Sequence, residues 1–177
     1  MKSLRAAASS EAGRPMILAL ATVDEAGEPQ VRSVVCRHID DDGELWITSD
    51  SRSAKHRELI RHPRAATVAW FPAAREQFRF NGPVEILDSF STRPERADIW
   101  QALSPETRAT FLWPDPGRPR VEASAFVRSS DQVVPPASFE VLVLRPVTVE
   151  QLVLTKHPHQ RRRWELNGAW SVRELNP

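Results

Sequence analysis

The sequence lacks several of the signals that assign a function directly. It has a single cysteine, Cys36, which excludes an internal disulfide and a cysteine-based zinc site. No glycine-rich loop of the dinucleotide-binding or P-loop type is present. We expect Cys36 to be a small apolar residue within a strand rather than a reactive group.

A long apolar run and a strong net charge are also missing. No stretch approaches the roughly 18 apolar residues of a membrane-spanning helix, and the apolar part of residues 1–16 is too short for a signal peptide. The 24 basic and 23 acidic residues give a formal net charge of +1. This balance argues against nucleic-acid binding through a strongly basic face. We therefore expect a cytoplasmic protein with no nucleic-acid partner and no membrane partner.

Metal binding is not expected either. His157 and His159 lie two residues apart and are too few for a structural zinc site without help from carboxylates. The aspartates at positions 40–42 lack the spacing and the terminal glutamate of a calcium-binding EF-hand loop. They indicate a turn instead.

Alternating hydrophobicity and turn signals predict a mainly β fold. The long strand expected at residues 75–87 should bury Phe78 and Phe80 on one face, and Gly82 before Pro83 predicts a bulge or bend within it. The expected strands are 16–24, 30–40, 44–50, 64–72, 75–87, two in 138–154, and the hairpin 161–175 with an Asn-Gly turn.

Helical spacing occurs at residues 53–63, 92–104 and 105–114. Thr92 is expected to cap the second helix, on which Ile99, Trp100 and Leu103 share a face. The proline-rich segment 114–136 should be a loop with a helical turn at 121–127, and such long loops are often functional. Closely spaced antiparallel strands favour a small barrel or two packed sheets. We expect one domain over residues 1–177, with a helical and loop insertion at about 92–136.

Basic side chains stand out at two places. Arg32 shares a strand face with the apolar residues Val34 and Cys36, where a cation needs a partner because burying an unpaired charge is costly. Arg52 and Lys55 lie in the segment "SDSRSAK" at the start of a helix, where the helix dipole disfavours cations.

Each place has a plain structural explanation as well as a functional one. Arg32 could form an ion pair with a carboxylate, and Asp50 or Ser51 could cap the helix while the basic chains stay solvated. Taken together, the two places favour a phosphate pocket, because helix N–H groups and serine hydroxyls add donors for an anion.

Five motifs follow one another in order: "RSVVCR" at 32–37, "WITSD" with "SRSAK" at 46–55, "HPR" at 62–64, "REQFRFNG" at 75–82 and "WSVRELNP" at 170–177. In this order they resemble the pyridoxamine-phosphate-oxidase-like family of FMN-binding split barrels. The resemblance spans most of the chain and is weakest at 93–136. It implies an antiparallel Greek-key split β-barrel and a homodimer with FMN at the subunit interface.

The resemblance also implies a set of cofactor contacts. The FMN phosphate would be held by Arg32 and Lys55, with Ser53 or Arg52. Gln77 of the neighbouring subunit would bond the flavin or its ribityl chain, and Arg161, or Arg162 if the gap falls differently, would be a late flavin-contacting arginine. The isoalloxazine would be lined by the backbone of Ser33, Val34 and Val35, with Ile47 and Thr48 beneath it.

The substrate residues of the family transfer less well. The oxidase grips its substrate phosphate with a tyrosine and an arginine, and this chain has no tyrosine. Trp100 and Arg108 lie in the corresponding region with a different spacing. Arg37 stands in place of a substrate-contacting lysine, and the pair His157 and His159 in place of an Arg-x-His motif.

The resemblance therefore predicts an FMN-dependent oxidoreductase acting on a small molecule, with hydride transfer from substrate to flavin and no evident protein base. The substrate could be pyridoxamine or pyridoxine 5'-phosphate. Two alternatives remain open: an NAD(P)H-dependent reductase of another substrate, and a flavin-binding module without turnover.

Overall fold

The computed structural model of the 177-residue chain describes residue 4 and residues 16–177. Most of the N-terminal stretch, for which no signal peptide is expected, lies outside the described residues. Within the described part, no helix is both long enough and apolar enough to cross a membrane.

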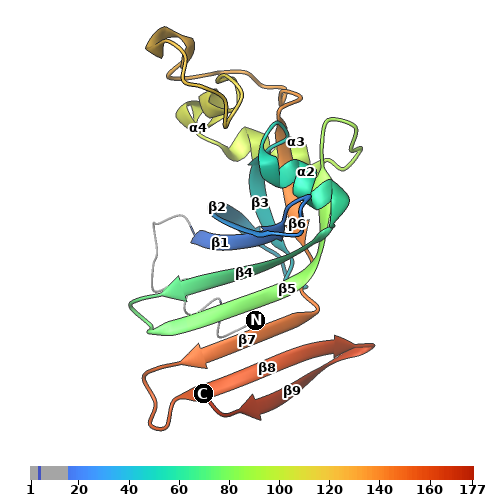
Figure 1. Cartoon of the computed structure of the whole chain (residues 1–177), viewed down its shortest axis with the longest axis vertical. Helices are drawn as coiled ribbons and strands as arrows, with labels where there is room; N and C mark the ends of the chain where they lie inside the picture. The colour runs from blue at the N-terminus through green and yellow to red at the C-terminus, as the bar shows by residue number, and fades with distance from the viewer. Residues whose placement is uncertain (1–3, 5–15) are drawn as a thin grey trace.

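Nine strands dominate the described residues, as the alternating pattern predicts (Figure 1). Short helices connect them: α2 (Ala54–Arg61) after the third strand, then α3 (Glu95–Ala102), α4 (Pro105–Thr110) and the 3-10 turn Ala123–Ala125. The strands are β1 (Met16–Val23), β2 (Pro29–Ile39), β3 (Leu45–Asp50), β4 (Arg64–Phe71), β5 (Glu76–Leu87), β6 (Phe139–Leu144), β7 (Thr148–Val153), β8 (Gln160–Asn167) and β9 (Ala169–Leu175).

Six of the strands close into an antiparallel barrel. The sheet order is β4-β1-β2-β3-β6-β5, and β4 also pairs with β5, which completes the ring. The run β4-β1-β2-β3 has the spatial order of a Greek key. Strands β7, β8 and β9 continue the sheet outward from β5 and form its lower edge in Figure 1. The mainly β, split-barrel prediction is confirmed.

The barrel splits at Gly82. Residues of β5 before this point pair with β7, from Glu76 opposite Val153 onward, and residues after it pair with β6. The link between β6 and β7 crosses here, where the Arg145 amide donates to the Pro83 carbonyl at 2.9 Å. No bulge interrupts the register of β5 with β4. The glycine instead permits a close backbone approach, at the point where β5 changes partners.

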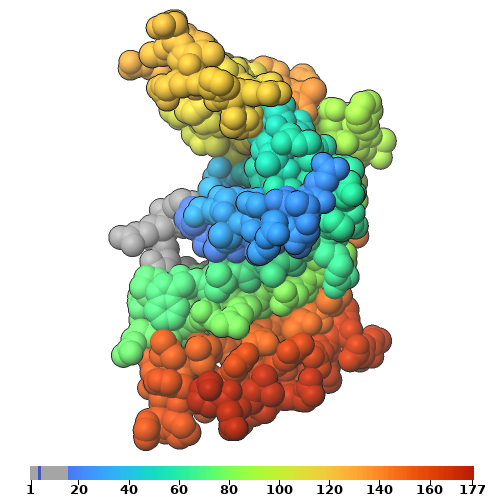
Figure 2. All heavy atoms as spheres, in the orientation of Figure 1, coloured from blue at the N-terminus to red at the C-terminus, as the bar shows by residue number. Residues whose placement is uncertain are grey.

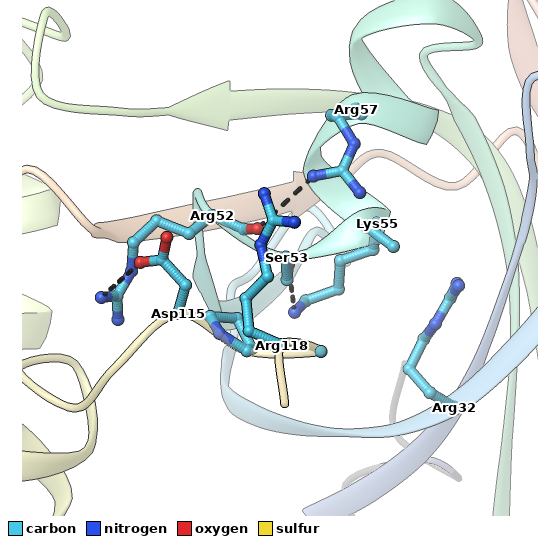
Figure 3. A pocket seen from close by; sticks show the side chains of 10 residues that line it. Arg32, Arg52, Ser53, Lys55, Arg57, Asp115 and Arg118 are labelled. Atoms are coloured by element: carbon cyan, nitrogen blue, oxygen red, sulfur yellow. Dashed lines mark hydrogen bonds and ion pairs between the residues drawn. The ribbon is translucent and has the colours of Figure 1, made fainter. Parts of the chain in front are cut away.

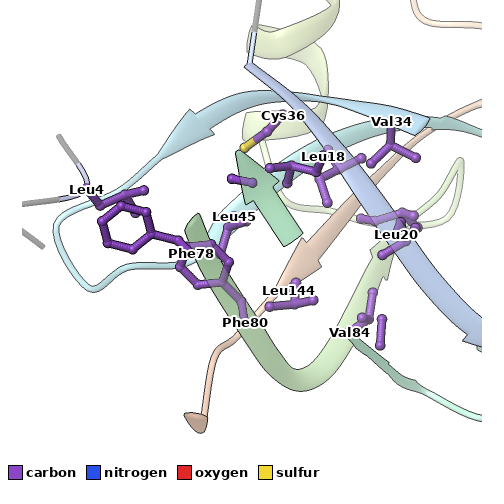
Figure 4. Packing of buried hydrophobic residues seen from close by; sticks show 14 of the residues in the cluster. Leu4, Leu18, Leu20, Val34, Cys36, Leu45, Phe78, Phe80, Val84 and Leu144 are labelled. Carbon is purple, nitrogen blue, oxygen red and sulfur yellow. The ribbon is translucent and has the colours of Figure 1, made fainter. Parts of the chain in front are cut away.

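The barrel interior holds the larger apolar cluster (Figure 4). Phe78 and Phe80 are 3% and 1% exposed, as their alternation predicts. Cys36 is also buried there, and burial raises the pKa of its thiol to about 12. The thiol is therefore protonated at neutral pH and serves as a packing group.

A second apolar cluster covers the outer face of β6, where α3 and α4 pack. Trp100 is fully buried in it and lies 5.0 Å from Phe139 between ring centroids. The expectation that Ile99, Trp100 and Leu103 share a packed face is confirmed.

The prediction that Thr92 caps this helix is wrong, because α3 begins at Glu95, after Pro94. A proline there fixes a helical φ without needing a capped amide.

We predict that Gly82→Ala destabilises the barrel severely. A Cβ on Gly82 would lie 1.8 Å from the oxygen of Arg145. This is a backbone atom, so it cannot move aside as the end of a flexible side chain could. The expected loss in the free energy of unfolding is at or beyond the upper end of the about 1–3 kcal/mol that overpacking costs, measured by urea denaturation. The matched control is Gly27→Ala, whose φ of +87° is strained but whose surroundings are open. Equal losses in the two variants would contradict the close approach.

Candidate functional site

A cleft of about 570 Å³ opens at the end of the barrel where α2 begins (Figure 3). One wall is Arg32, near the start of β2, and the first turn of α2, and the opposite wall is the loop 115–118 of the insert. In the space-filling view the insert projects as an arm beyond the barrel (Figure 2). The lining side chains are mainly basic: Arg32, Arg52, Lys55, Arg57 and Arg118, with Ser53 and Asp115 among the others.

Arg32 joins the cleft to the barrel. Its guanidinium donates to the Glu58 carboxylate of α2 at 2.8 Å and also to the Thr22 hydroxyl of β1. Glu58 and Thr22 are buried, while the Arg32 side chain is 25% exposed. The structural alternative for Arg32 is thus present, and the residue still borders the cleft. An ion pair of this kind fixes the position of the cation without removing it from a ligand's reach.

The start of α2 borders the cleft without a side-chain cap. Ser53 is the N-cap residue but makes no side-chain cap bond, because its hydroxyl donates to the Asp50 carbonyl at 2.6 Å. The predicted capping by Asp50 or Ser51 does not occur. Lys55 donates to the Ser53 hydroxyl at 2.9 Å. Burial lowers the pKa of Lys55, against the opposing influence of the Glu140 and Asp50 carboxylates.

A buried carboxylate lies under this helix start. Glu140 of β6 is fully buried, accepting from the Ser49 hydroxyl at 2.8 Å and contacting His56 Nδ1 of α2 at 2.7 Å. Burying a carboxylate is costly without such partners. The network ties α2 to the barrel wall and holds its first turn in place.

Arg52 has a different environment from Lys55. Its guanidinium binds both carboxylate oxygens of Asp50, the carbonyls of Phe111 and Trp113, and the carboxylate of Asp115. Side-chain hydrogen bonding to Asp50 is the main cause that raises the pKa of Arg52. Although it borders the cleft, the cation is already neutralised by protein carboxylates.

The segments expected to line the flavin ring run along β2 and β3. Ser33 and Val35 lie on the outer face of the barrel, and Thr48 lies close to them, accepting a hydrogen bond from Arg37 at 3.4 Å. Val34 and Ile47 point into the core, at 7% and 0% exposure. Only the backbone of these two residues can therefore face a ligand.

Gln77 and Arg161 lie away from the cleft, on the sheet extension. Gln77 of β5 is opposite Leu152 of β7, which in turn is opposite Arg161 of β8. The two polar residues therefore share one face, about 10 Å apart by the spacing of strands. Arg161 binds Glu150 at 2.7 Å, and Arg162 binds Glu174 on the other face. One chain alone does not bring Gln77 or Arg161 to the cleft.

Two of the five residues expected to contact substrate are engaged in structural contacts. Trp100 is fully buried and donates its indole N–H to the Gln132 carbonyl at 2.9 Å, which argues against a ligand contact. Arg108 donates to the last carbonyls of α3, at Trp100 and Gln101. Arg37 is exposed on β2, and His157 and His159 are exposed in the loop between β7 and β8. These three residues remain accessible.

Comparison with known proteins assigns the family. A family model described as "Pyridoxamine 5'-phosphate oxidase, FMN-binding domain" matches residues 2–88. A pyridoxine/pyridoxamine 5'-phosphate oxidase from Azorhizobium caulinodans is 33% identical over 182 residues, covering 92% of this chain and 83% of that protein. The chain belongs to the pyridoxamine 5'-phosphate oxidase-like family.

Solved structures agree with the family assignment. A pyridoxamine 5'-phosphate oxidase-related, FMN-binding protein from Nostoc punctiforme has a TM-score of 0.93 and 34% identity, covering 99% of this chain and 96% of that chain. PhzG from Burkholderia lata has the same fold at 24% identity, with a TM-score of 0.83 over 99% of this chain and 89% of its own. The family resemblance read from the five motifs is confirmed.

Several residues of the cleft in this family member went unnoticed in the sequence. Glu58 and Glu140 lie behind the cleft lining. Glu140 is a single carboxylate within the apolar strand β6, a weak sign of a buried partner, whereas Glu58 stands among the basic residues of α2 and gives no such sign. Asp115 and Arg118 lie in the segment 114–136, whose length alone suggested function. Nothing in the local pattern links them to α2, because the two segments meet only in the folded chain.

We predict that Arg32→Ala lowers stability as well as any ligand affinity. The variant leaves the buried Glu58 carboxylate with the Thr22 hydroxyl as its remaining partner. Losing a hydrogen bond to a charged group should cost about 1.5–3 kcal/mol, measured as the free energy of unfolding in urea. The double variant Arg32→Ala/Glu58→Gln should regain part of this loss, because it removes the unpaired charge. A single variant as stable as the parent chain would show that the ion pair contributes nothing.

Proposed function

We propose that the protein is an FMN-dependent oxidoreductase that works as a homodimer with the cofactor at the subunit interface. The observation that carries the proposal is the basic cleft at the start of α2, in a chain of a family whose model describes an FMN-binding domain. A phosphate monoester is the anion that such a helix start with converging cations suits best.

The charges of the cleft fit this anion. Arg32 and Arg52 are paired with carboxylates, whereas Lys55 has the Ser53 hydroxyl as its hydrogen-bond partner. Arg57 and Arg118 have no carboxylate partner among the described residues. The cleft therefore keeps an excess of positive charge. A dianionic phosphate would balance this charge and give Lys55 an anionic partner.

The chain's own groups would divide the binding between them. Arg32, Lys55, Ser53 and the amides of the first turn of α2 would hold the phosphate, and the outer face of β2 and β3 would support the ring. When bound, the flavin supplies the redox chemistry. The protein's part is to fix the ring's position and leave one of its faces open to a small molecule.

The outer face of the barrel favours a second copy of the chain as partner. Ile17, Val31 and Trp70 are 50%, 72% and 49% exposed on adjoining strands β1, β2 and β4. Trp70 is opposite Gln77, so this apolar area lies next to the residue expected to reach the flavin of the other subunit. Burying it in a homodimer would remove this apolar surface from water and could bring Gln77 and Arg161 of one subunit to the cleft of the other.

The substrate is proposed at the level of a small amine or alcohol carrying an anionic group. Arg37 and the two histidines of the β7–β8 loop are the accessible candidates to hold that anion, since Trp100 and Arg108 are engaged elsewhere. Pyridoxamine or pyridoxine 5'-phosphate fits this description. The missing tyrosine keeps the reductase and the flavin-binding module as alternatives.

The deciding experiment is aerobic turnover by the chain reconstituted with FMN. We expect quenching of flavin fluorescence on titration, then peroxide release with pyridoxamine 5'-phosphate. Bleaching of the flavin by NADPH or NADH without peroxide from the amine would select the reductase. Flavin binding with neither reaction would select the binding module, and a dimer that takes up no FMN at saturating concentration would defeat the proposal.

The affinity for FMN should fall as the pH rises through the alkaline range. Lys55 has a lowered pKa in the free protein because it is buried, and a bound phosphate would raise that pKa by stabilising the cation. FMN binding is thus strongest below the pKa that Lys55 has in the free protein. It weakens as the pH rises from that value towards the higher pKa of Lys55 in the complex. The measurement is the FMN Kd between pH 7 and 10, with riboflavin as a ligand that lacks the phosphate.

Lys55→Arg is the matched variant for this pH series, because arginine stays charged throughout the range. Its FMN affinity should be nearly flat with pH. An alkaline loss of the same size in the parent chain and in Lys55→Arg would show that another group is responsible.

A further inference from the structure

Arg52 has no donor left for a ligand. A guanidinium carries five N–H groups. In the structure Nε binds Asp50 at 3.0 Å, Nη2 binds Asp50 at 2.6 Å and the Phe111 carbonyl at 3.2 Å, and Nη1 binds the Trp113 carbonyl at 2.7 Å and Asp115 at 3.2 Å. Each of the five groups has an acceptor within the protein. Arg52 therefore stabilises the folded chain and has no N–H group left to bind an anion.

The chain that Arg52 holds leads directly into the opposite wall of the cleft. Phe111 and Trp113 follow α4, and Asp115 begins the lining loop 115–118. Ser138 donates to the Phe111 carbonyl at 2.7 Å and so ties the same point to the start of β6. These bonds fix the loop relative to the first turn of α2, which begins two residues after Arg52.

Arg118 is the cation that this loop carries to the cleft. Its side chain reaches from the loop towards the start of α2 (Figure 3). Among the described residues it has neither a hydrogen bond nor an ion pair. A positive charge held at a basic cleft without a carboxylate partner is unfavourable until an anion arrives.

Charge balance points to the same residue. A phosphate monoester carries about two negative charges at neutral pH. Arg32 is offset by Glu58, and Arg52 by Asp50 and Asp115, so these ion pairs cannot supply both positive charges. Lys55 supplies one charge from α2. Arg57, also on α2, likewise has no carboxylate partner in the described part of the chain, but it donates to the Arg52 carbonyl at 3.5 Å. Arg118 is the cation placed to supply the second charge from the opposite wall.

We propose that Arg118 is a direct ligand of the flavin phosphate, and that Arg52 and Asp115 are positioning residues that act on the phosphate only by fixing the loop that carries Arg118. The assignment rests on the proposed binding of FMN. It gives the insert a role in cofactor selection, because the loop would distinguish FMN from riboflavin, which lacks the phosphate.

The test compares Kd values for FMN and riboflavin by fluorescence titration of the full chain. Arg118→Gln should raise the FMN Kd about ten- to a hundredfold, the range for a lost hydrogen bond to a charged group, and leave the riboflavin Kd unchanged. Asp115→Asn should raise the FMN Kd less. Its effect should largely vanish in the Arg118→Gln background, because a positioning residue has nothing left to position.

Arg120→Gln is the matched control. Arg120 lies two residues further on, packs over the Phe126 ring at 5.2 Å and does not line the cleft, so its loss should leave both Kd values unchanged. An unchanged FMN Kd in Arg118→Gln, or an equal rise for FMN and riboflavin, would overturn the assignment while FMN binding itself stands. A parent chain that binds neither flavin would instead overturn the proposed function, and this assignment with it.

Discussion

Much of the structure depends on one strand that changes its partner within the sheet. β5 pairs with β4 along one edge, and along the other edge it changes partner from β7 to β6 at Gly82. The exchange needs the carbonyl of Arg145 to pass where a side chain would otherwise stand. Because β5 is a barrel strand on one side of this point and carries the extension on the other, the exchange sets the position of the extension relative to the barrel.

This division separates the candidate site into two parts. The basic cleft lies at the barrel end, where α2 and the insert meet, whereas Gln77 and Arg161 lie on the extension. A rigid sheet cannot fold back to join them within one chain. The exposed apolar residues of β1, β2 and β4 favour the binding of a second copy of the chain, so the proposed dimer depends on how the barrel places these strands.

The strands were predictable because their signals are local. Phe78 and Phe80 alternate with polar residues, and the Asn-Gly turn at 167–168 marks the last hairpin. The closure of β4 onto β5 and the change of partners at Gly82 are not local, and no periodicity encodes them. The start of α3 differs from the prediction for a related reason: Thr92 is a good cap by residue type, but the helix begins after Pro94, whose backbone is already helical at φ −65°.

The site was predictable only as far as residue types and family motifs reach. They indicated Arg32, Arg52 and Lys55 as cations near a phosphate, but a sequence gives no account of which donors are already used. The fold makes that distinction: it saturates Arg52, pairs Arg32 and leaves Lys55 with a hydroxyl. An anion site is therefore defined less by how many cations surround it than by how many of them lack a carboxylate, and that property emerges only when distant segments meet.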